Sequence, residues 1–206
     1  MHKIKNFFEQ SWLLIVAAFC FGLLVAITNS ALSERIEQNE REKLYSRMRA
    51  LITDANNFEK ALEQVPIPGK KGKIINTDIY KGLDDANNVT GYAFVAVGSG
   101  FADKIKIVIA VDDKCEKFLG FKVLSSNETP GFGSKIIEDN FGNQFKNVLA
   151  GKINLSKVGD PQVIDSRIVA ITGATVSSQA VVNIFNTYIE EIKEQLQTKE
   201  FIKNDS

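Results

Sequence analysis

A run of seventeen residues without a charged side chain, Trp12–Thr28, most constrains how this chain can fold. Extended to Leu32, the run has about 20 residues, enough for a helix that crosses a hydrocarbon core of about 30 Å. Trp12 would then lie at a membrane interface, where its amphipathic ring is favoured. We therefore predict a transmembrane helix over residues 12–32.

A cleaved signal peptide is the alternative interpretation of the same segment. Lys3 and Lys5 precede the apolar run, and Ala31-Leu32-Ser33 follows it as a small-x-small cleavage site. The run is longer than the usual apolar region of a signal peptide, which favours a retained anchor. Attachment as a lipoprotein through Cys20 is excluded, because Phe19 is too large for that processing site.

The charges around the span give its expected orientation. Lys3 and Lys5 favour a cytoplasmic N-terminus, and the positive-inside rule is weak for long translocated domains. Basic residues also follow the span, namely Arg35, Arg41, Lys43, Arg47 and Arg49. We expect a single-pass protein of the inner (cytoplasmic) membrane, with residues 1–11 in the cytoplasm and the remainder outside.

The composition excludes several classes of function. With 25 basic and 25 acidic side chains in 206 residues, the formal net charge is zero, which argues against nucleic-acid binding. The single histidine, His2, makes histidine acid–base catalysis and a His-ligated metal or haem improbable. Two cysteines cannot ligate an iron–sulfur cluster, which normally takes four. We expect no metal site and no catalytic side chain, so redox chemistry would need an organic cofactor.

The first segment after the span has a helical and strongly charged pattern from Ser33 to about Val65. We predict a helical stalk over 33–65, whose last part packs on a domain that comprises residues 66–206. Pro66, Pro68 and Gly69 would end the helix. The run from Gly69 to Lys73 lacks the GK[ST] ending of a phosphate-binding loop, so it predicts a turn.

The rest of the chain predicts an α+β fold, an antiparallel sheet packed with helices. Residues 89–97, 105–111 and 118–124 have strand composition and indicate a meander with one buried face. Residues 131–150 indicate a loop with short helices. From Val176, apolar residues recur at helical spacing, at Ala180, Val181, Ile184, Phe185, Tyr188, Ile189, Ile192 and Leu196.

Two segments carry residues that chemistry can use. The terminal helix is entered through hydroxyls and a glycine in Ile171–Ser178, which are ordinary capping residues but also suit an anion at a helix start. In Glu128–Gly133, a carboxylate, a hydroxyl and an aromatic ring converge within six residues, and two glycines allow close backbone approach. Taken alone, each segment also fits a capped helix or a tight loop.

Together, these segments resemble the FMN-binding G subunit of the Rnf ion-translocating electron-transport complex. A more distant resemblance is to the C subunit of the Na⁺-pumping NADH:quinone reductase. The resemblance covers nearly the whole chain, and its specific part is ETPGFG at 128–133 followed about 40 residues later by TGAT at 172–175. The N-terminal anchor and GYAFVAV at 91–97 are similar as well.

The resemblance implies a set of cofactor-binding residues. FMN would be held covalently, with its phosphate esterified to Thr175 by a separate flavin transferase that uses FAD. The implied neighbours of the cofactor are Thr172, Gly173, Ala174, Val176, Glu128, Thr129, Phe132 and Gly133, with Gly100 and Phe101 beside the ring. Lys157 would stabilise negative charge on the cofactor, or else is a solvated surface lysine.

One position departs from the family pattern. The flavinylation element usually carries an acidic residue six positions before the acceptor threonine, and Val169 stands there in this chain. Asp165 is nearby but out of register. If the transferase recognises that acid, flavin attachment to this chain would be inefficient or depend on another contact.

By resemblance, the chain is an electron-relay subunit of a complex that couples ferredoxin/NAD⁺ electron transfer to Na⁺ or H⁺ translocation. Its partners would be the other membrane and iron–sulfur subunits, the flavin transferase and the lipid bilayer. The span lacks an intramembrane charge, so the ion path would lie in other subunits. The alternatives are the C subunit of the quinone reductase, a membrane-anchored flavin-binding sensory or regulatory module, and a structural subunit with an empty pocket.

Overall fold

The computed structural model describes residues 2–69 and 72–202. Contacts divide the chain into two compact units, residues 1–43 and 44–206. Lys70 and Lys71, in the predicted turn, lie outside the described residues.

Helix α1, His2–Arg49, contains the predicted span. Within it, Ser11–Arg49 has a stretch long and apolar enough to cross a membrane, as judged by length and composition. Large side chains such as Leu14 and Phe21 are each 71% exposed, as the lipid-facing surface of a single span requires. A signal sequence would share these properties, so retention and topology stay predictions.

The predicted helix over 33–65 is correct only as far as Arg49. A turn follows, and strand β1 occupies Asn57–Pro68, so the prediction of helix for its second half is wrong. The compact unit also begins at Leu44 rather than at residue 66. The pairing of β1 with its neighbour shifts register twice between Lys60 and Val65, which breaks the alternation of buried and exposed side chains that marks a strand.

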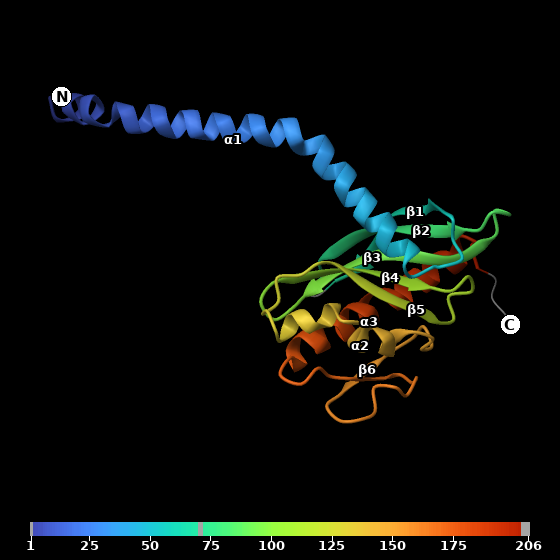
Figure 1. Cartoon of the computed structure of the whole chain (residues 1–206). Coiled ribbons are helices and arrows are strands. Elements are labelled where there is room, and N and C mark those ends of the chain that lie inside the picture. Colours follow the sequence, from blue (N-terminus) through green and yellow to red (C-terminus); the bar gives the residue numbers. More distant parts are fainter. Residues whose placement is uncertain (1, 70–71, 203–206) are drawn as a thin grey trace. The chain divides into compact units, whose positions relative to one another are not determined.

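The centre of the second unit is a five-stranded antiparallel sheet in the order β1-β2-β3-β4-β5 (Figure 1). Its further strands are β2 (Ile74–Leu83), β3 (Val89–Ser99), β4 (Lys104–Val111) and β5 (Phe118–Ser125). The three predicted strands and their antiparallel order are confirmed. Strand β2 was not predicted.

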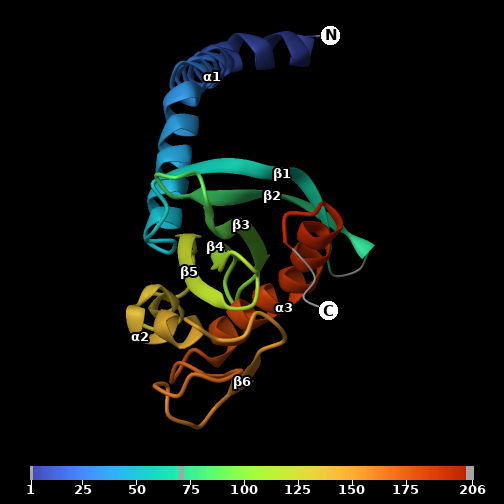
Figure 2. The ribbon, with the colours of Figure 1, turned by 90° about the vertical axis from the view of Figure 1, so that its right-hand side faces the viewer.

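Each face of the sheet is covered, so the prediction of one buried face is wrong. On one face lies helix α3, Thr175–Thr198, whose eight predicted apolar positions are all buried (Figure 2). On the other, Met48, Leu51 and Ile52 pack against β4 residues such as Val108 and Ala110. The last five residues of β4 are consequently buried without interruption.

Short elements connect β5 to α3. They are the 3₁₀ helix η2 (Gly133–Ile137), helix α2 (Asp139–Gly142), η3 (Asn143–Phe145) and two short parallel strands, β6 (Asn154–Ser156) and β7 (Arg167–Val169). The predicted loop with short helices at 131–150 is confirmed. Aromatic rings anchor this region to α3, and they belong to Phe118, Phe121, Phe141, Phe145 and Phe185. The path of these elements brings the TGAT segment beside ETPGFG.

Candidate functional site

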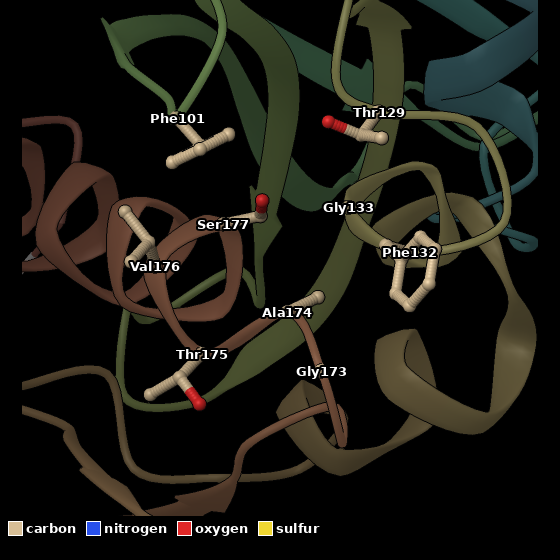
Figure 3. Close-up of a pocket in the computed structure, with 9 residues that line it drawn as sticks. All are labelled: Phe101, Thr129, Phe132, Gly133, Gly173, Ala174, Thr175, Val176 and Ser177. Atoms are coloured by element: carbon tan, nitrogen blue, oxygen red, sulfur yellow. The ribbon is translucent and has the colours of Figure 1, made fainter.

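A pocket of about 470 Å³ lies at the N-terminal end of α3 (Figure 3). Three separate segments supply its walls: the β3–β4 loop, the loop after β5 and the start of α3. The lining residues are Phe101, Thr129, Phe132, Gly133, Gly173, Ala174, Thr175, Val176 and Ser177. The structure therefore brings the two motifs together, and the volume is within the range of small-molecule sites.

The start of α3 offers free hydrogen-bond donors to this pocket. The residue before the helix is Ala174, which has no side-chain oxygen to cap the first turn. The first N–H groups of any α-helix lack an intrahelical acceptor, and the helix dipole places partial positive charge there. The position is thus suited to an anionic group such as a phosphate.

The turn before the helix is held by a serine and a glycine. The Ser178 hydroxyl accepts a hydrogen bond from the Ile171 N–H at 3.0 Å and donates one to the Ala174 carbonyl at 2.9 Å. Gly173 has a φ of 80°, a conformation that other residues rarely adopt. A Cβ at Gly173 would lie 3.1 Å from the Phe132 ring, so the glycine also keeps space beside that ring.

Thr175 is the first residue of α3 and lines the pocket half-buried. Its hydroxyl is therefore placed at the uncapped helix start, where a phosphoester would receive hydrogen bonds from the first-turn amides. Thr172, three residues earlier, is exposed and is not among the lining residues.

The walls of the pocket are apolar and open to solvent. Phe101 is 64% exposed, and Phe132 and Val176 are each 57% exposed. Figure 3 shows Phe101 and Val176 on one side of the pocket and Phe132 on the other, with Ala174 between them. Exposed aromatic rings around a concave site are suited to stacking on a flat aromatic ligand.

Glu128 occupies a different place from the predicted one. The resemblance implies that it borders the flavin ring, but the side chain is 5% exposed and lies behind the pocket wall. Its carboxylate accepts hydrogen bonds from the backbone N–H groups of Phe101 and Ala102 and from the Ser177 hydroxyl. Gly100 lies behind the wall with it. The sequence analysis did not identify Ser177, because a serine in a first helical turn is ordinary.

Lys157 is exposed, directly after β6, and is not among the lining residues. Its position matches the alternative of a solvated surface lysine. Among the residues that the structure describes, there is no group of three or more histidine, cysteine, aspartate or glutamate side chains that could hold a metal ion.

Val169, at the position where the family usually has an acid, ends β7 and is fixed through its backbone. Its N–H donates to Gln144 Oε1 at 2.7 Å, and Gln144 Nε2 donates to its carbonyl at 3.2 Å. Asp165 is hydrogen-bonded to the backbone N–H and the guanidinium of Arg167, contacts that lower its pKa. Thus the nearby acid already has a partner of its own.

One comparison with known proteins covers the part of the chain that forms the pocket. The model of the FMN-binding domain matches residues 100–190, a range that contains all three pocket segments. This part of the chain is similar to the FMN-binding domain family. The donors at the α3 start and the aromatic walls fit this cofactor, which combines a phosphate with a flat ring system.

Curated relatives extend over most of the chain. The G subunit of the ion-translocating oxidoreductase complex from Methanosarcina acetivorans is 26% identical over 88% of this chain and 92% of its own length. The G subunit of the proton-translocating ferredoxin:NAD(+) oxidoreductase complex from Clostridium ljungdahlii is 28% identical over 87% of this chain and 88% of its own length. The chain is a homologue of these G subunits, which confirms the resemblance drawn from the motifs.

Solved structures share the α+β fold. The C subunit of the Na(+)-translocating NADH-quinone reductase from Parabacteroides distasonis superposes with a TM-score of 0.55 and 17% identity, covering 77% of this chain and 95% of that one. Shewanella oneidensis NqrC gives a TM-score of 0.54 and 18% identity, covering 71% and 73%. At these identities the likeness concerns the α+β fold alone.

Proposed function

We propose that this chain is a membrane-anchored electron-transfer subunit of an ion-translocating oxidoreductase complex and that it carries FMN in the pocket at the start of α3. The homologous G subunits and the FMN-binding domain support the proposal. The observation that carries it is the position of Thr175, on an uncapped helix start inside a pocket with aromatic walls.

Bound FMN supplies the capacity to take up and release one or two electrons. The residues of the chain bind and orient it. The first-turn amides of α3 would hold the phosphate, and Phe101, Phe132 and Val176, which line the pocket, would contact the ring system. Because electron transfer requires no proton transfer by a side chain, the absence of an interior histidine from the sequence is no obstacle.

We further propose that the attachment is covalent. The Thr175 hydroxyl oxygen bonds to the FMN phosphorus of FAD, the pyrophosphate bond breaks, AMP leaves, and the hydroxyl proton passes to solvent. A flavin transferase would perform this step. A covalent bond keeps the cofactor on a domain that faces a dilute extracytoplasmic space.

The proposed topology places residues 1–11 in the cytoplasm, residues 12–32 of α1 across the inner membrane and the flavin domain outside. The partners would be the other membrane and iron–sulfur subunits of the complex. The Clostridium relative is named for proton translocation and for ferredoxin and NAD(+), so we propose the same reaction class here, with Na⁺ or H⁺ as the ion.

Flavin fluorescence in a denaturing gel tests the attachment. The full-length chain is coexpressed with a flavin transferase beside Thr175→Ala and the control Thr198→Ala, whose exposed side chain lies at the other end of α3. We expect fluorescent bands for the wild type and the control, and a dark band for Thr175→Ala. A dark wild-type band, with the transferase active on another substrate protein, would contradict covalent attachment.

The C subunit of a Na⁺-translocating quinone reductase is the second candidate, because the solved structures of that protein share the fold. The proteins that copurify with the chain from its native membrane separate the two. Iron–sulfur subunits of a ferredoxin-linked complex support the first candidate, and quinone-reductase subunits support the second. Recovery with signalling proteins alone would instead indicate a regulatory module.

A further inference from the structure

We propose that Glu128 is a positioning residue, whose carboxylate ties the three pocket segments together and keeps a negative charge directly behind the cofactor site. This inference rests on the proposed function, because it concerns how the same pocket holds FMN. It assigns to the first residue of ETPGFG a role behind the wall instead of contact with the ring.

The hydrogen bonds of Glu128 connect all three walls. Its Oε1 accepts from the N–H of Phe101 at 2.9 Å and from the N–H of Ala102 at 3.0 Å, both in the β3–β4 loop. Its Oε2 accepts from the Ser177 hydroxyl in the first turn of α3. Glu128 itself belongs to the third segment, the loop after β5. Loss of the carboxylate would leave the hydrogen bond from Asn127 Nδ2 to Asp103 Oδ2, at 3.0 Å, between the loop after β5 and the β3–β4 loop, and would remove the carboxylate's bonds to both other walls.

Two glycines make room for this carboxylate. A Cβ at Gly100 would collide with Glu128 Oε1, and a Cβ at Gly133 would lie 2.9 Å from Oε2 and 2.6 Å from Ser177 Oγ. Neither glycine has a positive φ, so close packing, and not backbone conformation, explains why these positions are glycine. The backbone of the pocket thus closes directly over Glu128 on two sides.

The hydrogen-bond pattern is that of an ionised carboxylate, since Glu128 accepts from three donors. Gly133 and Ser177, which touch it, both line the pocket. The charge is therefore separated from the cofactor site by the thickness of the wall. In a buried position it is weakly screened and disfavours the addition of an electron nearby. We expect Glu128 to make the flavin harder to reduce.

Hydrogen exchange of the chain without flavin tests the positioning role. The full-length Thr175→Ala protein in detergent is compared with the same protein carrying Glu128→Ala or Glu128→Gln. We expect Glu128→Ala to speed exchange at Phe101 and Ala102 about tenfold or more, as expected when hydrogen bonds to a charged acceptor are lost. Glutamine keeps an acceptor for these amides and should change exchange much less.

Phe118 provides the internal control, since its N–H donates to the Val148 carbonyl at 2.8 Å and it lies at the start of β5, whereas Glu128 follows the end of that strand. Unchanged exchange at Phe101 and Ala102 in Glu128→Ala would overturn the positioning role. The measurement uses no cofactor, so it stands even if the wild-type chain carries no flavin, a result that would refute the proposed function instead.

The potential of the bound flavin tests the role of the charge. Glu128→Gln removes the charge at nearly constant shape, and Glu116→Gln removes an exposed charge from the β4–β5 turn, roughly 25 Å away at the other end of β4. We expect a shift to a more positive potential in Glu128→Gln and no shift in Glu116→Gln. Equal potentials in the wild type and Glu128→Gln would overturn the electrostatic part of the proposal.

Discussion

Replacement of Gly133 by alanine should destabilise the domain because of contacts visible in the structure. An ideal Cβ at this position would lie 2.6 Å from Ser177 Oγ, 2.9 Å from Glu128 Oε2 and 3.0 Å from Glu128 Cβ. Carbon contacts are optimal at about 3.5–4.0 Å, so the loop or α3 must move by roughly 0.5–1 Å. The neighbours are tied to one another and cannot move independently.

Forcing an extra methyl group into such a site costs about 1–3 kcal/mol of the free energy of unfolding. The loss of backbone freedom in the unfolded chain offsets about 0.4–1 kcal/mol. A net loss of about 1–2 kcal/mol remains, which corresponds to a fall in Tm of about 2–8 °C for a chain of this size.

The assay is thermal unfolding followed by circular dichroism, in the Thr175→Ala background so that bound flavin does not alter stability. Gly142→Ala is the matched control, because its Cβ would meet nothing within 4 Å and its φ is −63°. Its Tm should rise by about 1–4 °C. Equal Tm values for Gly133→Ala and Gly142→Ala would refute the packing argument.

Three further predictions concern the core, a buried thiol and the departure from the family pattern. Phe185 is fully buried, with its ring centroid 4.7 Å from that of Phe145, so Phe185→Ala should cost about 3–5 kcal/mol in denaturant unfolding, whereas Leu149→Ala, 70% exposed, should cost little. Burial raises the pKa of the Cys115 thiol to about 12, so in a Cys20→Ser background this thiol should resist a thiol reagent at pH 8 until the protein is unfolded. The contribution of the buried thiol to stability is complete below pH 9 and is lost between pH 9 and 12, because the thiol of the unfolded chain ionises first. Val169→Asp should increase the fraction of chains with in-gel flavin fluorescence at limiting transferase, and an unchanged fraction would show that the acid is not recognised here.

Regular packing explains which parts of the fold were predictable. Helix α3 buries a single stripe against the sheet, so its spacing of 3.6 residues is directly visible in the sequence. Strands β3 and β4 consist largely of β-branched and aromatic residues, and β5 adds leucines to them. Strand β1 was missed because its bulges interrupt the alternation of buried and exposed side chains, and the buried Phe58 and Val65 are seven residues apart, a spacing that a helix also produces.

The site was predictable in its members and less so in their arrangement. The TGAT and ETPGFG motifs identified most of the residues that line the pocket, including Thr175 and Phe132. The burial of Glu128 depends on partners 26 and 27 residues before it and 49 residues after it. A single sequence contains no signal for such distant pairs, and the position expected for Glu128, beside the flavin ring, came from the family resemblance alone.

The turn within ETPGFG explains why its two ends act as a unit. The N–H groups of Phe132 and Ser134 both donate to the Thr129 carbonyl, at 3.2 and 3.1 Å, and fold the segment back until Gly133 lies on the Glu128 carboxylate.

Substitutions at the two ends should therefore be coupled. Glu128→Ala removes the carboxylate oxygen with which an alanine Cβ at position 133 would clash. It also frees the Ser177 hydroxyl to turn away from that Cβ. The double variant should lose at least about 0.5 kcal/mol less unfolding free energy than the sum of the single losses. Additivity within about 0.3 kcal/mol, measured by denaturant unfolding without flavin, would mean that Gly133 is small for a reason other than Glu128.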